Sequence, residues 1–156
     1  MSDSTRLTRR YRFSASHRLH SPHLSEEENR NVYGKCNNPH GHGHDYILDV
    51  TICGTPDPES GLMVSRNDLD QWVERRVLKL FNHRYINKDV AAFAGQVPTT
   101  ENVALVIAGL LAEDWQAAFP SVGARVARVH VLETDRNGFE VQLDSAGNVV
   151  REECQT

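Results

Sequence analysis

The order of its segments most strongly limits the folds open to this chain. Two segments with helical periodicity lie in the middle, with a pair of strand-like segments on each side. The strand-like segments show alternating apolar residues or are rich in β-branched and aromatic residues, and they cover residues 6–17, 44–53, 124–134 and 139–144. The helical segments lie between the second and third of them. This order predicts an α+β fold with a four-stranded antiparallel sheet and two helices on one face.

The two helical segments begin at residue types that cap helices. The candidate caps are Ser65 or Asn67 for the first helix and Thr99 or Thr100 for the second. The residues that recur at helical spacing are Leu69, Trp72, Val73, Arg76, Val77 and Leu80 in the first helix, and Val103, Val106, Ile107, Leu110 and Leu111 in the second, with Trp115 near its end.

Length and composition indicate one globular domain over residues 1–156, and no linker or internal repeat divides it. No apolar run approaches the roughly 20 residues of a membrane span, and no apolar run follows the N-terminal arginines as a secretory signal requires. The net charge of −4 and the absence of a basic run give nucleic-acid binding little support. Three cysteines form no disulfide pattern, so we expect a reducing, cytoplasmic location. The edges of a small open sheet are expected to be closed by oligomerisation.

Residues 18–42 are rich in Gly, Pro and Asn, which predicts a long loop. A loop of this length in a compact domain is usually either functional or disordered.

Histidines are concentrated around this loop. His42 and His44 lie two residues apart on an extended chain, so both can reach one ion, and His17 ends a neighbouring strand. Three neutral imidazoles with an open fourth position are typical of catalytic zinc, although copper, nickel or iron also accept nitrogen ligands. His40 has the same phase as His42 and could replace a ligand, and a solvated polar loop is the non-functional alternative.

Cys36 stands close to this histidine cluster in the sequence. It could be a fourth ligand, but structural zinc sites tend to use cysteine pairs, and the chain has no Cys-x-x-Cys. The other possibility is a thiolate base or nucleophile whose pKa is lowered by the ion and by cations such as Lys35.

Taken together, these residues resemble the 6-pyruvoyltetrahydropterin synthase family from Phe13 to about Val141. The matching stretches are FSASHRL at 13–19, LSEEEN at 24–29, YGKCNNPHGHGHDY at 33–46, TTEN at 99–102 and VLETDRN at 131–137. The resemblance implies the tunnelling fold, in which the sheets of several subunits join into a barrel. The family barrel is typically a trimer, two trimers stack as a hexamer, and active sites lie between subunits.

The resemblance also implies roles for individual residues. The zinc ligands fall on His17, His42 and His44, and the catalytic residues on Cys36 and His83. The positions near the pterin are Glu133, which anchors the ring, and Thr99, Thr100 and Glu101. A carboxylate suits the pterin because it accepts parallel hydrogen bonds from the ring amide and the exocyclic amine.

One position departs from the family pattern, since Asn82 stands where the family usually has Asp. An Asn carbonyl can accept a hydrogen bond from the His83 imidazole but carries no charge. We therefore expect slower turnover or another acid in that role, with Asp45 and Asp89 as candidates.

The implied substrate is 7,8-dihydroneopterin triphosphate. Zinc would acidify protons next to the side-chain hydroxyls, Cys36 would remove one, and internal redox transfer with triphosphate elimination would follow. Arg18 and Lys35 are candidate phosphate contacts.

The five residues between Cys36 and His42 resemble the spacing in the pyruvoyl-forming branch of the family. The carboxy-forming branch, 6-carboxytetrahydropterin synthase of deazapurine biosynthesis, usually has three residues there. The sequence from Cys36 to His40 also satisfies that shorter spacing. A non-catalytic metal-binding or pterin-binding homologue is a third possibility.

Overall fold

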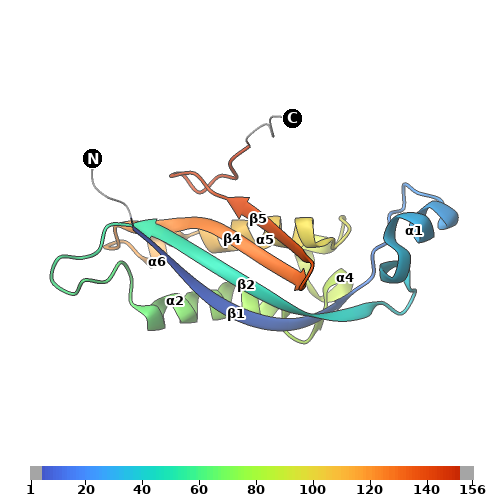
Figure 1. Cartoon of the computed structure of the whole chain (residues 1–156), viewed down its shortest axis with the longest axis horizontal. Coiled ribbons are helices and arrows are strands. Elements are labelled where there is room, and N and C mark those ends of the chain that lie inside the picture. The colour runs from blue at the N-terminus through green and yellow to red at the C-terminus, as the bar shows by residue number, and fades with distance from the viewer. Residues whose placement is uncertain (1–4, 152–156) are drawn as a thin grey trace.

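The computed structural model describes residues 5–151 and contains one five-stranded sheet covered on one face by helices (Figure 1). The strands are β1 (Thr5–His17), β2 (His42–Gly54), β3 (Arg84–Tyr85), β4 (Ala124–Thr134) and β5 (Asn137–Gln142). Their order in the sheet is β3-β1-β2-β4-β5, and the four long strands pair antiparallel. The α+β class and the four predicted strands are therefore confirmed.

The fifth strand, β3, is an addition that the sequence did not predict. It pairs in parallel with β1 at Ala15 and Ser16. A strand of two residues shows no alternation that a sequence pattern could reveal, so the predicted number of four strands was wrong.

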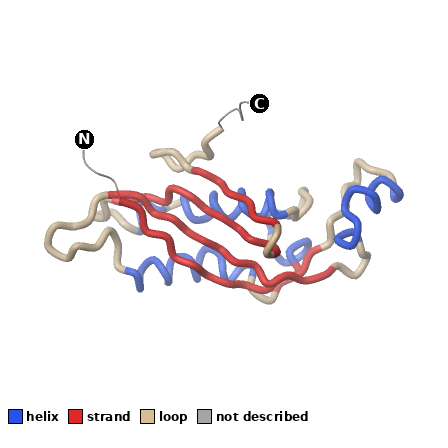
Figure 2. Tube along the Cα trace, in the orientation of Figure 1, coloured by secondary structure: helices blue, strands red, loops and turns tan. Residues whose placement is uncertain are grey.

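The helices form a second layer along one face of the sheet, as Figure 2 shows. They are α2 (Arg66–Val73), a π-helical turn (Glu74–Leu78), α3 (Lys79–Phe81), α4 (Ile86–Asp89), a 3₁₀ turn (Ala91–Phe93), α5 (Thr100–Ala112) and α6 (Trp115–Ala118). The side chains of Ser65 and Thr99 cap α2 and α5 by accepting hydrogen bonds from backbone N–H groups, so two of the four candidate caps are selected.

Both long helices depart from the predicted periodicity near their C-terminal ends. The wide turn at Glu74–Leu78 shifts the residues that follow it around the helix axis. As a result Phe81 is fully buried, whereas Leu80, which continues the helical spacing of the sequence pattern, is 42% exposed. The second helix stops before Trp115, because Asp114 adopts a left-handed conformation with φ 60°.

The predicted loop over residues 18–42 contains a helix, α1 (Glu26–Tyr33), and a 3₁₀ turn (Gly34–Asn37). Ser25 and Glu28 form a capping box in which each side chain accepts a hydrogen bond from the other residue's backbone N–H, at 3.1 and 2.7 Å. This Ser-x-x-Glu signal is present in the sequence, so the helix was predictable. In Figure 1, α1 projects beyond one end of the sheet.

The two faces of the sheet differ because side chains alternate along each strand. The face towards the helices is apolar, and its fully buried residues include Tyr46, Leu48, Val50, Ile52, Val129 and Val131. The opposite face carries ion pairs, Arg10 with Asp49 and Arg128 with Glu140. Among residues 5–151, no helix has both the length and the apolar character needed to cross a membrane.

A polar clamp fastens α2 to the edge of the sheet. Arg9 donates two hydrogen bonds to the carboxylate of Asp70, both 2.7 Å long, and the Tyr11 hydroxyl donates a third at 2.7 Å. These hydrogen bonds hold the pKa of Asp70 below its ordinary value of 3.8. The ionised carboxylate is therefore the form that stabilises the fold.

We predict that Asp70→Asn lowers the free energy of unfolding by about 1 kcal/mol at neutral pH, because an amide cannot accept the paired hydrogen bonds of Arg9. A depressed pKa in the folded state means that the stabilisation is complete above pH 3.8 and is lost as the pH falls below that value. Urea unfolding of both proteins across this range measures the difference. Asp68→Asn, an exposed position on the same helix, is the matched control, and a difference that persists in acid would contradict the prediction.

Candidate metal and active site

The β1–β2 ladder brings three histidines together. His17 lies directly opposite His42, and His44 is two residues further along β2, on the same face. The ring centroids are 5.4 Å apart for His17 and His42, 5.0 Å for His17 and His44, and 4.5 Å for His42 and His44. The three residues predicted as metal ligands therefore converge, whereas His40 is exposed and lies outside the group.

Gly41 makes this approach possible. Its backbone has φ +70°, and a Cβ at this position would lie 2.8 Å from the carbonyl oxygen of His17. Only glycine combines this conformation with such close contact, which fixes how β2 begins beside the end of β1.

The tautomer of His17 is set by its surroundings. Its Nδ1 donates to the carbonyl oxygen of Pro98 at 3.0 Å and lies 3.3 Å from the Tyr46 hydroxyl oxygen. A proton on Nδ1 leaves a lone pair on Nε2, and this nitrogen, like Nε2 of His44, is buried without a hydrogen-bond partner among the described residues. Such orphaned nitrogens are the donors that a metal ion satisfies.

Burial also keeps His17 neutral. It lowers the pKa of His17 to about 4, with the neighbouring His44 adding to the effect, and burial lowers the pKa of His44 as well. Because metals bind the neutral imidazole, both side chains are in the ligating form over the physiological range.

Cys36 comes from the 3₁₀ turn after α1 and places its Sγ 3.1 Å from Nε2 of His42. The ligand atoms of His17, Cys36, His42 and His44 all lie within 4.8 Å of one another, so the group could hold a metal ion. Burial and the charge of Glu133 raise the pKa of the thiol. Burial and Glu133 therefore disfavour the thiolate that the sequence led us to expect, whereas a bound cation would favour it.

Glu133 lies at this cluster rather than on the surface. Its Oε1 is 3.4 Å from Nε2 of His44 and 3.7 Å from Nε2 of His17, and the side chain is 12% exposed. The pairing of β4 with β5 shifts register between Leu132 and Thr134, and such irregularities re-aim side chains. A carboxylate thus stands beside the histidines at the end of β4.

The Thr99–Glu101 segment adjoins the same place through Pro98, whose carbonyl holds His17. Thr99 is occupied as the cap of α5, whereas the Thr100 hydroxyl is buried with no hydrogen-bond partner among the described residues. The side chain of Glu101 is exposed.

Asn82 and His83 are held elsewhere, at the outer edge of β1. Oδ1 of Asn82 accepts from the backbone N–H of Ser14 at 3.0 Å, and the backbone N–H of His83 donates to the Ser14 carbonyl at 2.6 Å. His83 has φ 59°, a left-handed conformation that is uncommon outside glycine. The sequence suggested that the Asn82 carbonyl could accept a hydrogen bond from the His83 imidazole. In the structure it accepts one from the strand backbone instead.

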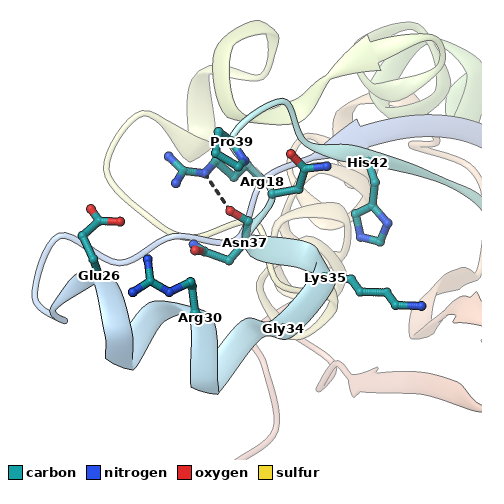
Figure 3. A pocket seen from close by; sticks show the side chains of 9 residues that line it. Arg18, Glu26, Arg30, Gly34, Lys35, Asn37, Pro39 and His42 are labelled. Carbon is teal, nitrogen blue, oxygen red and sulfur yellow. Dashed lines mark hydrogen bonds between the residues drawn. The ribbon is translucent and has the colours of Figure 1, made fainter.

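A cationic cavity of about 470 Å³ opens next to His42 (Figure 3). Arg18, Arg30 and Lys35 line it together with Glu26, and Nε of Arg18 donates to the Asn37 carbonyl at 3.2 Å. Figure 3 shows Arg30 on α1, pointing towards the same space as Arg18. Sequence reasoning singled out Arg18 and Lys35 but missed Arg30, because α1 was taken for a loop.

Comparisons with known proteins agree on one family. The family model described as 6-pyruvoyl tetrahydropterin synthase matches residues 6–144. The 6-pyruvoyl tetrahydrobiopterin synthases of Poecilia reticulata and Homo sapiens are each 44% identical over 131 residues, covering 84% of this chain and 85% and 86% of those proteins. The solved 6-pyruvoyl tetrahydropterin synthase of Caenorhabditis elegans superposes with a TM-score of 0.80 at 37% identity, covering 91% of this chain and 97% of that one. The chain therefore belongs to the 6-pyruvoyl tetrahydropterin synthase family.

Proposed function

We propose that this protein is a zinc-dependent 6-pyruvoyltetrahydropterin synthase that converts 7,8-dihydroneopterin triphosphate by internal redox transfer and triphosphate elimination. The observation that carries the proposal is the convergence of three imidazoles, two of which keep a buried Nε2 with no hydrogen-bond partner among the described residues. The names of the relatives support the reaction, and the sparse cysteines, of which Cys36 and Cys53 are free in the described residues, support a cytoplasmic location.

His17, His42 and His44 would hold the zinc ion. Three neutral nitrogen donors fit zinc and leave a further position for substrate. When bound, the ion supplies Lewis acidity to the substrate's side-chain hydroxyls and favours the thiolate form of Cys36.

Glu133 would anchor the pterin ring, with Thr99, Thr100 and Glu101 alongside it. A carboxylate can accept two parallel hydrogen bonds from the pterin amide and exocyclic amine. The buried Thr100 hydroxyl lacks a partner among residues 5–151 and would gain one from the substrate.

The cavity beside His42 would receive the triphosphate. Arg18, Arg30 and Lys35 bring three positive charges to its wall against the one carboxylate of Glu26. Arginine and lysine side chains bind phosphate oxygens through charge-assisted hydrogen bonds. This arrangement would place the leaving group next to the metal ligands.

Cys36 would act as the base and His83 as its partner, brought together by two different chains. Within one chain, Cys36 contacts His42 beside the metal ligands, while His83 is fastened to the far edge of β1 beside Ser14. Both edges of the sheet can pair with the sheet of another subunit. One edge is β5, and the other is β1, which pairs with β3 at only two residues. A hexamer built as a dimer of trimers, with sites between subunits, would satisfy both requirements.

The product distinguishes this function from its alternatives. We expect the zinc-loaded protein to convert 7,8-dihydroneopterin triphosphate to the 6-pyruvoyl product, measured by mass spectrometry. A 6-carboxy product would instead indicate the 6-carboxytetrahydropterin synthase of deazapurine biosynthesis, and absence of turnover would indicate a non-catalytic metal-binding or pterin-binding protein.

Zinc content tests the ligand assignment. His17→Ala, His42→Ala and His44→Ala should each reduce the metal from about one ion per chain to a small fraction, because each removes one of three donors. His40→Ala is the matched control, since His40 is exposed beside the same segment, and Cys36→Ala should also retain the metal. Elemental analysis of the folded variants would contradict the assignment if His40→Ala lost zinc while His44→Ala kept it.

Mixed oligomers test the intersubunit site. Cys36→Ala and His83→Ala should each be inactive alone, yet oligomers refolded from an equal mixture should regain activity at about a quarter of their sites. The reason is that some sites then combine an intact Cys36 with an intact His83 of a neighbour. Continued inactivity of a mixture whose hybrid oligomers are verified by native mass spectrometry would count against a shared site.

A further inference from the structure

Ser14 joins three residues with chemical potential at the edge of β1. Its backbone N–H donates to Asn82, its carbonyl accepts from the His83 N–H, and its hydroxyl forms a 2.5 Å hydrogen bond with Oδ1 of Asp45. Ser14 and Asp45 are direct partners in the β1–β2 ladder. The positions of His83 and Asp45 are therefore fixed by the same residue.

Asn82 cannot supply the charge that a protonated imidazole needs. Its side chain is neutral, and its oxygen is already used by the Ser14 N–H. This leaves Asn82 as a clamp that sets the backbone of His83, and the counter-charge has to come from another residue.

Asp45 meets this need by position. Two cavities, of about 540 and 330 Å³, lie against this edge, and Ser14, Asp45 and His83 line both of them. One oxygen of Asp45 binds Ser14, and the structure gives its other oxygen no hydrogen-bond partner among the described residues.

The other charged groups at the two cavities are less suited to the role. Asp89 lines only the larger cavity, and its Oδ2 accepts from the Tyr85 N–H at 2.8 Å. Arg84 in the larger cavity and Arg12 in the smaller one are positive, so neither can supply the counter-charge of a protonated imidazole.

We propose that Asp45 is the positioning carboxylate for His83, replacing the charge that Asn82 lacks. This inference rests on the proposed function, in which His83 assists Cys36. An ionised Asp45 orients the imidazole and stabilises its positive charge during proton transfer, while Ser14 holds the carboxylate in place.

The test is a swap of the carboxylate between two positions. Asp45→Asn keeps the size of the side chain and its ability to accept from Ser14, and should lower kcat at least about tenfold with little change in KM or zinc content. Adding Asn82→Asp to that variant should restore most of the lost kcat, which a purely structural role of Asp45 would not allow. Asp89→Asn is the control and should retain kcat, since an amide oxygen can still accept from Tyr85.

The inference is overturned if Asp45→Asn turns over like the parent protein, or if the double variant stays as slow as Asp45→Asn. Histidine ring nitrogen resonances give a readout that does not need turnover. The His83 signals should shift in Asp45→Asn and stay in place in Asp89→Asn. Unchanged His83 signals in Asp45→Asn would reject the pairing even in a protein that converts no substrate, whereas shifted signals without turnover would reject only the proposed function.

Discussion

The direct pairing of His17 with His42 across the β1–β2 ladder is the constraint on which the site depends. Thirteen consecutive residue pairs set the register of these strands, from Thr5 with Gly54 to His17 with His42. Every second side chain of both strands faces the helices. A slip of one residue in the pairing register would therefore expose the apolar core and, at the same time, move the imidazoles apart. The free energy that stabilises the sheet therefore also organises the three imidazoles proposed to bind the metal, which suits a preformed site.

The parts of this arrangement that depend on local pattern were predictable from the sequence. The alternation of His42 and His44 and the ends of two strands predicted three histidines that the structure does bring together. The capping box at Ser25 was equally visible, and the helix it begins was missed because glycine, proline and asparagine dominate the rest of the segment. That error concealed Arg30 and with it part of the cationic cavity.

Other features depend on contacts between distant segments and leave no local signal. The hydrogen bond from His17 to Pro98, which sets the imidazole tautomer, joins residues 81 positions apart. The approach of Glu133 to the histidines follows from an irregularity in pairing at the end of β4. The wide turn in the helix after α2 exchanges Leu80 for Phe81 in the core, although both are apolar and fit a helical pattern equally well.

Two tasks are needed at His83: its backbone must be held in place, and its imidazole needs a counter-charge. Asn82 holds the backbone of His83 against Ser14, and among residues 5–151 the carboxylate that hydrogen-bonds to Ser14 is that of Asp45. Under the proposed pairing of Asp45 with His83, the position where the resemblance expects Asp keeps its backbone contact as Asn82, and a neighbour in space carries the charge. Such exchanges are invisible to a comparison of single positions.

X-ray absorption spectroscopy of the zinc-loaded protein tests most directly whether three imidazoles bind the metal and leave Cys36 free to react. The expected spectrum contains three nitrogen scatterers and one exchangeable light atom at about 2.0–2.2 Å, unchanged in Cys36→Ala. A sulfur scatterer at about 2.3 Å that disappears in Cys36→Ala would make Cys36 a fourth ligand and would contradict its role as the base.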